Sequence, residues 1–138
     1  MKIFVDTWGW LVLADPKDPL HSEAVGCYEE FSGRTGRVVT SNFILNETFT
    51  LLFRRRPHKE ALHFSEGLLQ SPFIRIETVT EHRFLRAFEL RRKFSDKPRI
   101  SFTDLSSMAI MMELKVSDIL TGDPHFNQVG FGFRTLPN

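Results

Sequence analysis

The sequence predicts an α/β protein with three layers, α/β/α, in which helices cover both faces of a mostly parallel central sheet. Short apolar runs alternate along the chain with longer segments of helical periodicity, and parallel strands need such helical crossovers. The 138 residues match the size of one ordinary domain. We therefore expect a single domain that spans residues 1–138.

The expected strands are short apolar runs that charged or turn-forming residues bound. In chain order they are Ile3–Val5, Arg37–Thr40, Phe73–Val79, Ile119–Thr121 and Phe131–Leu136. The first and fourth runs are short and largely apolar, so we place both in the centre of the sheet. An aspartate closely follows each of these two runs, Asp6 after the first and Asp123 after the fourth.

The expected helices lie between the strands, and proline or glycine ends several of them. They are Trp8–Ala14, Pro19–Phe31, a helix that Asn42 caps and that reaches Arg56, then Lys59–Leu69, Glu81–Phe94 and Phe102–Leu114. Pro16 and Pro57 follow the first and third of these helices, and Gly33 follows the second.

Composition limits the class of protein. Charged residues make up 25% of the chain and the formal net charge is +1, which predicts a soluble globular protein and not a general nucleic-acid binder. The single cysteine, Cys27, excludes an internal disulfide and a cysteine-based zinc site, and it suits a reducing cytosol. No apolar run approaches the ~20 residues of a membrane span, and the apolar start is too short for a signal peptide. We expect a cytoplasmic protein.

Four acidic residues stand where a predicted strand ends or near the start of a predicted helix: Asp6, Glu47, Asp104 and Asp123. The carboxyl ends of parallel strands line one crevice, so carboxylates from distant segments can converge there. Such a cluster is unfavourable without a cation, because like charges raise one another's pKa. Mg²⁺ or Mn²⁺ suits an all-oxygen site. The pattern predicts a metal-dependent enzyme that acts on phosphate esters.

Each of these residues also has a structural interpretation. Asp6 can cap a turn or a helix, Asp104 ends a Ser-x-x-Asp capping-box pattern, and Asp123 precedes a proline that can open a helix. Glu47 is the hardest to explain in this way. It lies inside a helix among mostly apolar neighbours, and an unpaired glutamate is rarely buried.

Four stretches carry a resemblance to a known family: Phe4–Thr7, Thr40–Thr48, Ser101–Asp104 and Leu120–Phe126. In this order and spacing the chain resembles PIN-domain nucleases, specifically the VapC-type toxins of toxin–antitoxin pairs. The resemblance covers nearly the whole chain. It implies a PIN-like fold and a metal-dependent endoribonuclease in which the four carboxylates bind one or two divalent cations. It also implies a small antitoxin as partner and a homodimer.

The chain departs from the family pattern at one position. The family often has a small polar residue two positions after the first aspartate, and Trp8 stands there in this chain. Thr7 still supplies a hydroxyl near the expected metal, as an accessory group. Trp8 bears on how the substrate is positioned and leaves the carboxylate set intact.

Two basic runs are candidates for contact with RNA phosphates. Their members are Arg54, Arg55, Arg56, Lys59, Arg91 and Arg92, with Lys93, Lys97 and Arg99 continuing the second run. The alternative is that they solvate helix surfaces. His125 can touch substrate or be structural, and Phe126 should pack in the core beneath the site.

Other functions remain open at this point. A non-catalytic RNA- or protein-binding module has the same fold, and a DNA-directed nuclease has the same chemistry. A purely structural α/β domain leaves the four matching acidic stretches unexplained. The sequence contains no phosphate-binding Gly-x-x-x-x-Gly-Lys loop, no dinucleotide-binding fingerprint and no serine nucleophile elbow.

Overall fold

The computed structural model describes residues 1–33 and 35–137. Its centre is a five-stranded sheet in the order β3-β2-β1-β4-β5, and every pair of neighbouring strands is parallel. The strands are β1 (Ile3–Val5), β2 (Val38–Ser41), β3 (Ile74–Glu77), β4 (Asp118–Leu120) and β5 (Arg134–Leu136). The predicted α/β class with a mostly parallel sheet is confirmed, and so is the interior position of the first and fourth strands.

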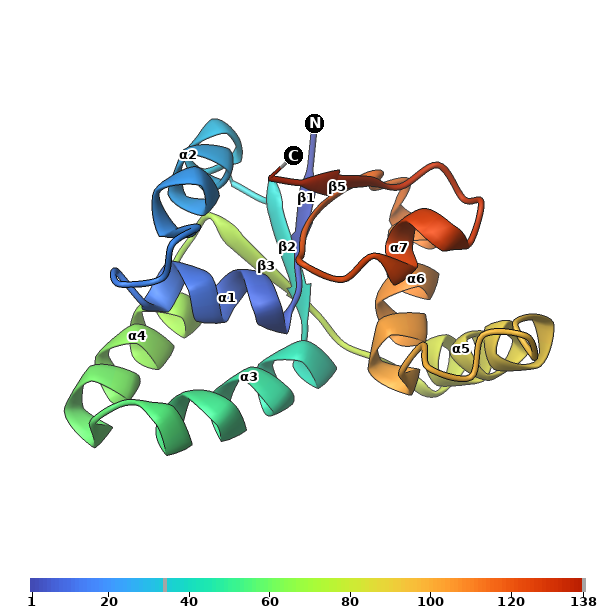
Figure 1. Cartoon of the computed structure of the whole chain (residues 1–138), viewed down its shortest axis with the longest axis horizontal. Helices are drawn as coiled ribbons and strands as arrows, with labels where there is room; N and C mark the ends of the chain where they lie inside the picture. Colours follow the sequence, from blue (N-terminus) through green and yellow to red (C-terminus); the bar gives the residue numbers. More distant parts are fainter. Residues whose placement is uncertain (34, 138) are drawn as a thin grey trace.

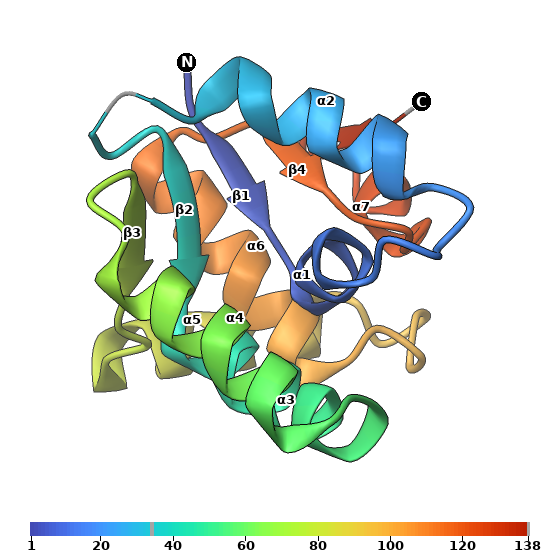
Figure 2. The same ribbon diagram turned by 90° about the vertical axis from the view of Figure 1, so that its left-hand side faces the viewer.

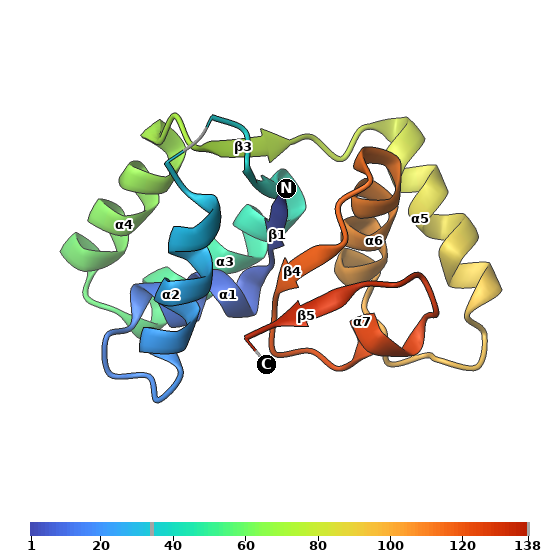
Figure 3. The same ribbon diagram turned by 90° about the horizontal axis from the view of Figure 1, so that it is seen from above.

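Helices cover both faces of this sheet. Figure 3 shows α1 to α4 on one side of the strands and α5, α6 and α7 on the other, which gives the expected three layers. The helices are α1 (Thr7–Ala14), α2 (His21–Phe31), α3 (Asn42–Arg55), α4 (His58–Gln70), α5 (Glu81–Lys93), α6 (Phe102–Leu114) and α7 (His125–Gln128). None of these described helices combines the length and apolar character that a membrane crossing requires.

The direction of the strands decides where the loops and helix starts gather. Strands β1, β2 and β3 point the same way, and α1 and α3 begin at the carboxyl ends of β1 and β2 (Figure 1; Figure 2). The strand β4 pairs with β1 through Phe4 opposite Ile119 and Val5 opposite Leu120, so its end lies beside that of β1. The segments after β1, β2 and β4 therefore meet at one edge of the sheet.

The core lies on both faces of the sheet. All three residues of β1 are fully buried, and the largest buried side chains include Phe4, Phe31 and Phe126. Phe126, on the short helix α7, is 0% exposed, which confirms its expected place in the core. This tight packing fixes the strand ends that carry the candidate site.

Several boundaries differ from the sequence prediction. The cap of α3 is Ser41, whose hydroxyl accepts from the Ile44 N–H at 3.2 Å. Asn42 is instead the first helical residue, and its side-chain oxygen accepts from Val79 N–H at 2.7 Å. The last strand starts only at Arg134, because the backbone before it turns through glycines with positive φ. The short helix α7 follows Pro124, for which the sequence indicated only that a helix can open there.

Candidate active site

Asp6 links the end of β1 to the start of α1. One carboxylate oxygen caps the helix by accepting from Gly9 N–H at 3.0 Å, and the other accepts a hydrogen bond from the Thr121 hydroxyl. The side chain is nearly enclosed, with Asp6 only 5% exposed. Burial raises its pKa from 3.8 to about 7, and the negative charges of Asp123 and Glu47 add smaller upward effects. Asp6 is thus both a helix cap and an acidic group of the site.

Asp104 and Asp123 lie together on the other side of the site. Asp104 sits in the first turn of α6, where its own N–H donates to the Ser101 hydroxyl at 3.0 Å. Burial raises the pKa of the Asp104 carboxyl, and its hydrogen bond and charge interaction with Asp123 raise it further. Asp123 accepts from His125 N–H at 2.9 Å. The predicted capping box of Asp104 therefore exists in part, and it places the carboxyl beside Asp123.

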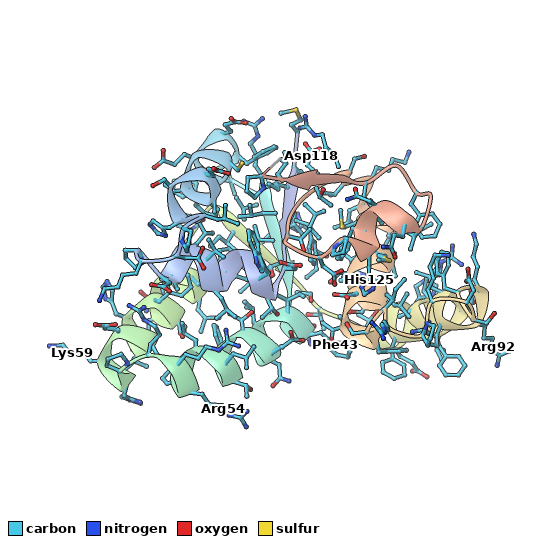
Figure 4. The ribbon with its side chains drawn as sticks, in the orientation of Figure 1. Phe43, Arg54, Lys59, Arg92, Asp118 and His125 are labelled. Carbon is cyan, nitrogen blue, oxygen red and sulfur yellow. The ribbon has the colours of Figure 1, made fainter. Side chains whose placement is uncertain are left out.

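His125 belongs to the same group. One possible ligand atom from each of Asp104, Asp123 and His125 lies within 4.8 Å of the others. The imidazole Nδ1 is buried and lies 2.9 Å from a carboxylate oxygen of Asp123, but the geometry does not make a hydrogen bond. Figure 4 shows His125 facing the middle of the molecule. A buried polar atom without a partner is expected beside a binding site.

Glu47 reaches the site from α3 as an exposed residue, although its neighbours in the sequence are mostly apolar. The structure leaves Glu47 exposed, because the buried residues of α3 follow a different face that includes Ile44, Leu45 and Thr48. Its carboxylate lines the same cavity as the three aspartates. The four carboxylates named from the sequence are therefore brought together at the carboxyl edge of the sheet.

Two threonines hold α1 against α3 beneath this group. The Thr48 hydroxyl donates to the Thr7 hydroxyl at 3.3 Å, and Thr7 in turn lies 3.5 Å from the Ile44 carbonyl, to which it donates. Thr7 also lines the cavity. Its hydroxyl thus fixes the relative position of the helices that present Asp6 and Glu47.

The carboxylates share an open cavity of about 500 Å³ with two arginines. Its wall includes Asp6, Glu47, Asp104 and Asp123, and also Trp8, Arg55 and Arg99. Every predicted ligand offers oxygen, and burial together with the neighbouring carboxylates raises the pKa of Asp6 and of Asp104. Oxygen donors that repel one another suit a hard divalent cation. The residues present therefore fit a divalent metal ion.

The six basic residues predicted to bind RNA lie in different places. Only Arg55 lines the acidic cavity. Figure 4 shows Arg54 at the lower edge of the molecule and Lys59 and Arg92 at its two ends. Arg56 is held by Asp15 at 3.2 Å and Glu60 at 2.9 Å. Arg91 donates to the carbonyls of Phe94, Lys97 and Ile100, so it braces the segment that leads to α6.

Two residues near the site, Arg99 and Thr121, carried a weaker signal in the sequence. Arg99 lines the cavity but was only the last member of a basic run, and Thr121 binds Asp6 although only its place before Asp123 pointed to it. From its place in the sequence Asp118 is expected to be a surface or capping residue, but it is buried at the start of β4. There it pairs with Arg134 at 2.8 Å, at the opposite edge of the sheet from the cavity (Figure 4).

Comparison with known proteins gives consistent matches over nearly the whole chain. The PIN domain family model matches residues 3–132. The chain is 33% identical over 129 residues to the 23S rRNA-specific endonuclease VapC20 of Mycobacterium tuberculosis, covering 94% of this chain and 95% of that protein. It is 28% identical over 129 residues to a VapC ribonuclease of Archaeoglobus fulgidus, and the match covers 92% of this chain and 80% of that protein. The crystal structure of VapC20, described as a toxin that cleaves the sarcin-ricin loop, matches with a TM-score of 0.81 at 32% identity, over 94% of this chain and 96% of that one.

Proposed function

The chain belongs to the PIN domain family, in its VapC group, and from this we propose that it is a divalent-metal-dependent endoribonuclease. One observation supports this more than any other. Four carboxylates from segments far apart in the sequence share one open cavity at the carboxyl edge of the parallel sheet. Relatives that match most of the chain are named as RNA-cleaving enzymes, which favours RNA over other phosphodiesters.

We assign the cation to Asp6, Glu47, Asp104 and Asp123, with Mg²⁺ or Mn²⁺ as the ion. His125 lies close enough to Asp104 and Asp123 to help to orient their carboxylates. When bound, a divalent cation polarises the scissile phosphate and lowers the pKa of a water molecule, which supplies a nucleophile.

The side chains of the protein set the geometry for this chemistry. The Gly9 N–H and the Thr121 hydroxyl hold the two oxygens of Asp6, so its carboxylate presents a fixed orientation. Arg55 at the end of α3 and Arg99 before α6 enter the cavity wall from different elements. Together they can hold a phosphodiester between them and above the carboxylates.

The VapC relationship also supports a biological role as the toxin of a toxin–antitoxin pair, with a small antitoxin as partner. We propose a homodimer as the assembled form. The VapC20 relative is described as a toxin. An antitoxin that covers the acidic cavity would block the same groups that we assign to RNA.

The test is a cleavage assay of the purified protein with total RNA and with DNA, in Mg²⁺ or Mn²⁺ and in EDTA. We expect RNA to be cleaved only with the metal, and Asp104→Asn to abolish cleavage while the fold is retained. Asp118→Asn is the matched control, because Asp118 is also buried but lies outside the cavity. Binding of RNA without cleavage would instead indicate a non-catalytic module, and cleavage of DNA alone would indicate a DNA-directed nuclease.

A further inference from the structure

A second cavity adjoins the acidic one, and the proposed chemistry does not use it. It has a volume of about 370 Å³, and it shares Trp8, Leu11 and Arg55 with the acidic cavity. The two cavities are therefore neighbours across a common wall. The volume lies within the ~300–1,000 Å³ that is typical of small-ligand sites.

The lining of this second cavity has two parts. Its floor is apolar and well packed, with Val12 4% exposed and Leu52 2% exposed. Its rim is charged and fixed, because Arg56 holds Asp15 at 3.2 Å and Glu60 at 2.9 Å. An apolar floor with a polar rim suits a flat ring that has hydrogen-bonding edges, and it does not suit a bare phosphate.

Trp8 is the aromatic group of the shared wall, and its position is set by a close backbone contact. A Cβ atom at Gly122 would lie 2.5 Å from the indole nitrogen of Trp8 and 2.6 Å from Cε2. The indole therefore lies directly against the Gly122 backbone, beside Asp123. Any larger residue at position 122 would displace the ring.

The other tryptophan is used differently. Trp10 is 2% exposed, its ring nitrogen donates to the Thr40 hydroxyl at 3.0 Å, and it packs against Tyr28. Trp8 is half-buried, and among the described residues its ring nitrogen makes no hydrogen bond. Trp10 is thus a core residue, whereas Trp8 leaves part of its ring facing the cavities.

Arg55 is the charged residue that the two cavities share. It is exposed, it lines both cavities, and within residues 1–33 and 35–137 it has no ion-pair partner. A nucleotide whose phosphate lies near Arg55 and the carboxylates would carry its base to the adjoining space beside Trp8. Aromatic side chains provide stacking surfaces for bases in single-stranded RNA.

We propose that Trp8 and the adjoining cavity form a binding site for one unpaired nucleobase of single-stranded RNA, next to the phosphodiester held in the acidic cavity. The site deepens the proposed function, on which it rests, by making Trp8 a residue that positions the substrate. Asp15 and Asp18 add carboxylate acceptors that N–H groups on the edge of a base can use. The bulky residue that departs from the usual family pattern thereby gains a role in binding.

The experiment measures binding of fluorescently labelled single-stranded RNA to the Asp104→Asn protein, so that cleavage does not interfere. The probes are one mixed-sequence RNA and a set of the same RNA with a single base removed at each position in turn. Each is measured with Trp8 intact, with Trp8→Ala and with Trp8→Phe. Phe88→Ala is the matched control, because Phe88 is an aromatic residue on α5 that is 45% exposed and lines neither cavity. Thermal melts check that each variant is folded.

We expect Trp8→Ala to weaken binding of the intact RNA roughly 5- to 150-fold, which corresponds to the loss of one stacked base. Removal of the base at one position should weaken binding by a similar factor when Trp8 is present and have no effect in Trp8→Ala. Trp8→Phe should recover most of the affinity, and Phe88→Ala should change nothing. RNA binding should also quench tryptophan fluorescence with Trp8 present and not in Trp8→Ala.

Equal losses of affinity for Trp8→Ala and Phe88→Ala, or base removal that acts equally with and without Trp8, would overturn the base site. The proposed function is judged separately by cleavage in the Asp104-containing protein. If that protein cleaves RNA while Trp8→Ala binds normally, the base site is rejected and the nuclease stands. If it binds RNA in a Trp8-dependent way without cleaving it, the base site stands and the nuclease is rejected. Failure of the Asp104→Asn protein to bind any RNA rejects the base site, and absence of cleavage by the Asp104-containing protein rejects the nuclease.

Discussion

Replacement of Asp6 by asparagine should stabilise the metal-free protein, and the gain should grow with pH. Asp6 is 5% exposed, and its burial raises its pKa from 3.8 to about 7. The folded protein therefore keeps this proton over a pH range in which the unfolded chain has lost it. The stability due to this group is present below about pH 4 and is lost as the pH rises through about 7.

The size of the change in stability follows from the difference between the pKa of Asp6 in the folded protein and in the unfolded chain. Each pKa unit corresponds to about 1.4 kcal/mol, so ionisation of Asp6 lowers the free energy of unfolding by up to ~4 kcal/mol near pH 8 and by ~1.5 kcal/mol near pH 5. Asparagine does not titrate, and it keeps an acceptor for the Gly9 N–H. It loses the acceptor for the Thr121 hydroxyl, which costs about 1 kcal/mol. Asp6→Asn should therefore match the unmodified protein near pH 5 and exceed it by ~3 kcal/mol near pH 8.

The assay is urea unfolding in EDTA at both pH values. Asp118→Asn is a control for which we expect stability to fall and not to rise. Its pair with Arg134 lies outside the cavity, so this change should lower stability slightly at both pH values, by roughly 1 kcal/mol or less. A stability difference between Asp6→Asn and the unmodified protein that stays constant from pH 5 to pH 8 would refute the reasoning. So would a loss of stability for Asp6→Asn at pH 8.

Three further predictions concern the arginines and the metal. Arg55→Ala and Arg99→Ala should each weaken RNA binding by the Asp104→Asn protein. Each should also flatten the log–log dependence of affinity on salt by about 0.7 for every phosphate that is no longer neutralised. Arg54→Ala should do neither, and equal effects of all three variants would contradict the assignment. Arg91→Ala should lower the free energy of unfolding by roughly 2–4 kcal/mol in urea, because three carbonyls lose a charged donor, and the folded variant should bind RNA normally. Mg²⁺ should raise the melting temperature of the unmodified protein more at pH 8 than at pH 5, because protons compete for the carboxylates; an equal rise at both pH values would count against them as ligands.

The acidic part of the site could be predicted because strand direction determines it. Parallel strands bring their carboxyl ends to one edge whatever the loops do, so an aspartate just after β1 and another just after β4 must lie near each other. Asp104 follows from topology in another way, because α6 leads into the parallel strand β4 and so begins at the carboxyl edge of the sheet. These positions depend on topology, and topology can be read from the alternation of strands and helices.

The rest of the site depends on features that the sequence does not display. Glu47 is exposed because of how α3 rotates against its neighbours, and a count of apolar neighbours does not give that rotation. Glu47 and Arg55 are eight residues apart and share the face of α3 that lines the cavity. Arg91 binds main-chain carbonyls, for which no residue type is a signal. A run of charged residues in the sequence does not show which arginine lines the cavity and which one binds main-chain carbonyls.

The balance of charge in the cavity links metal binding to RNA binding. Four carboxylates and two arginines line it, so their formal charges leave a net negative site before any cation binds. A phosphodiester is repelled by that site when all four carboxylates are ionised. Burial raises the pKa of both Asp6 and Asp104, so protonation of these two groups offsets the repulsion at and below neutral pH. One divalent cation brings the formal charge to neutral, and Arg55 and Arg99 then attract the phosphate without opposition. The chain carries a net charge of only +1, so no general positive field replaces this local change. RNA affinity above neutral pH should therefore depend on the cation even where no bond is cleaved.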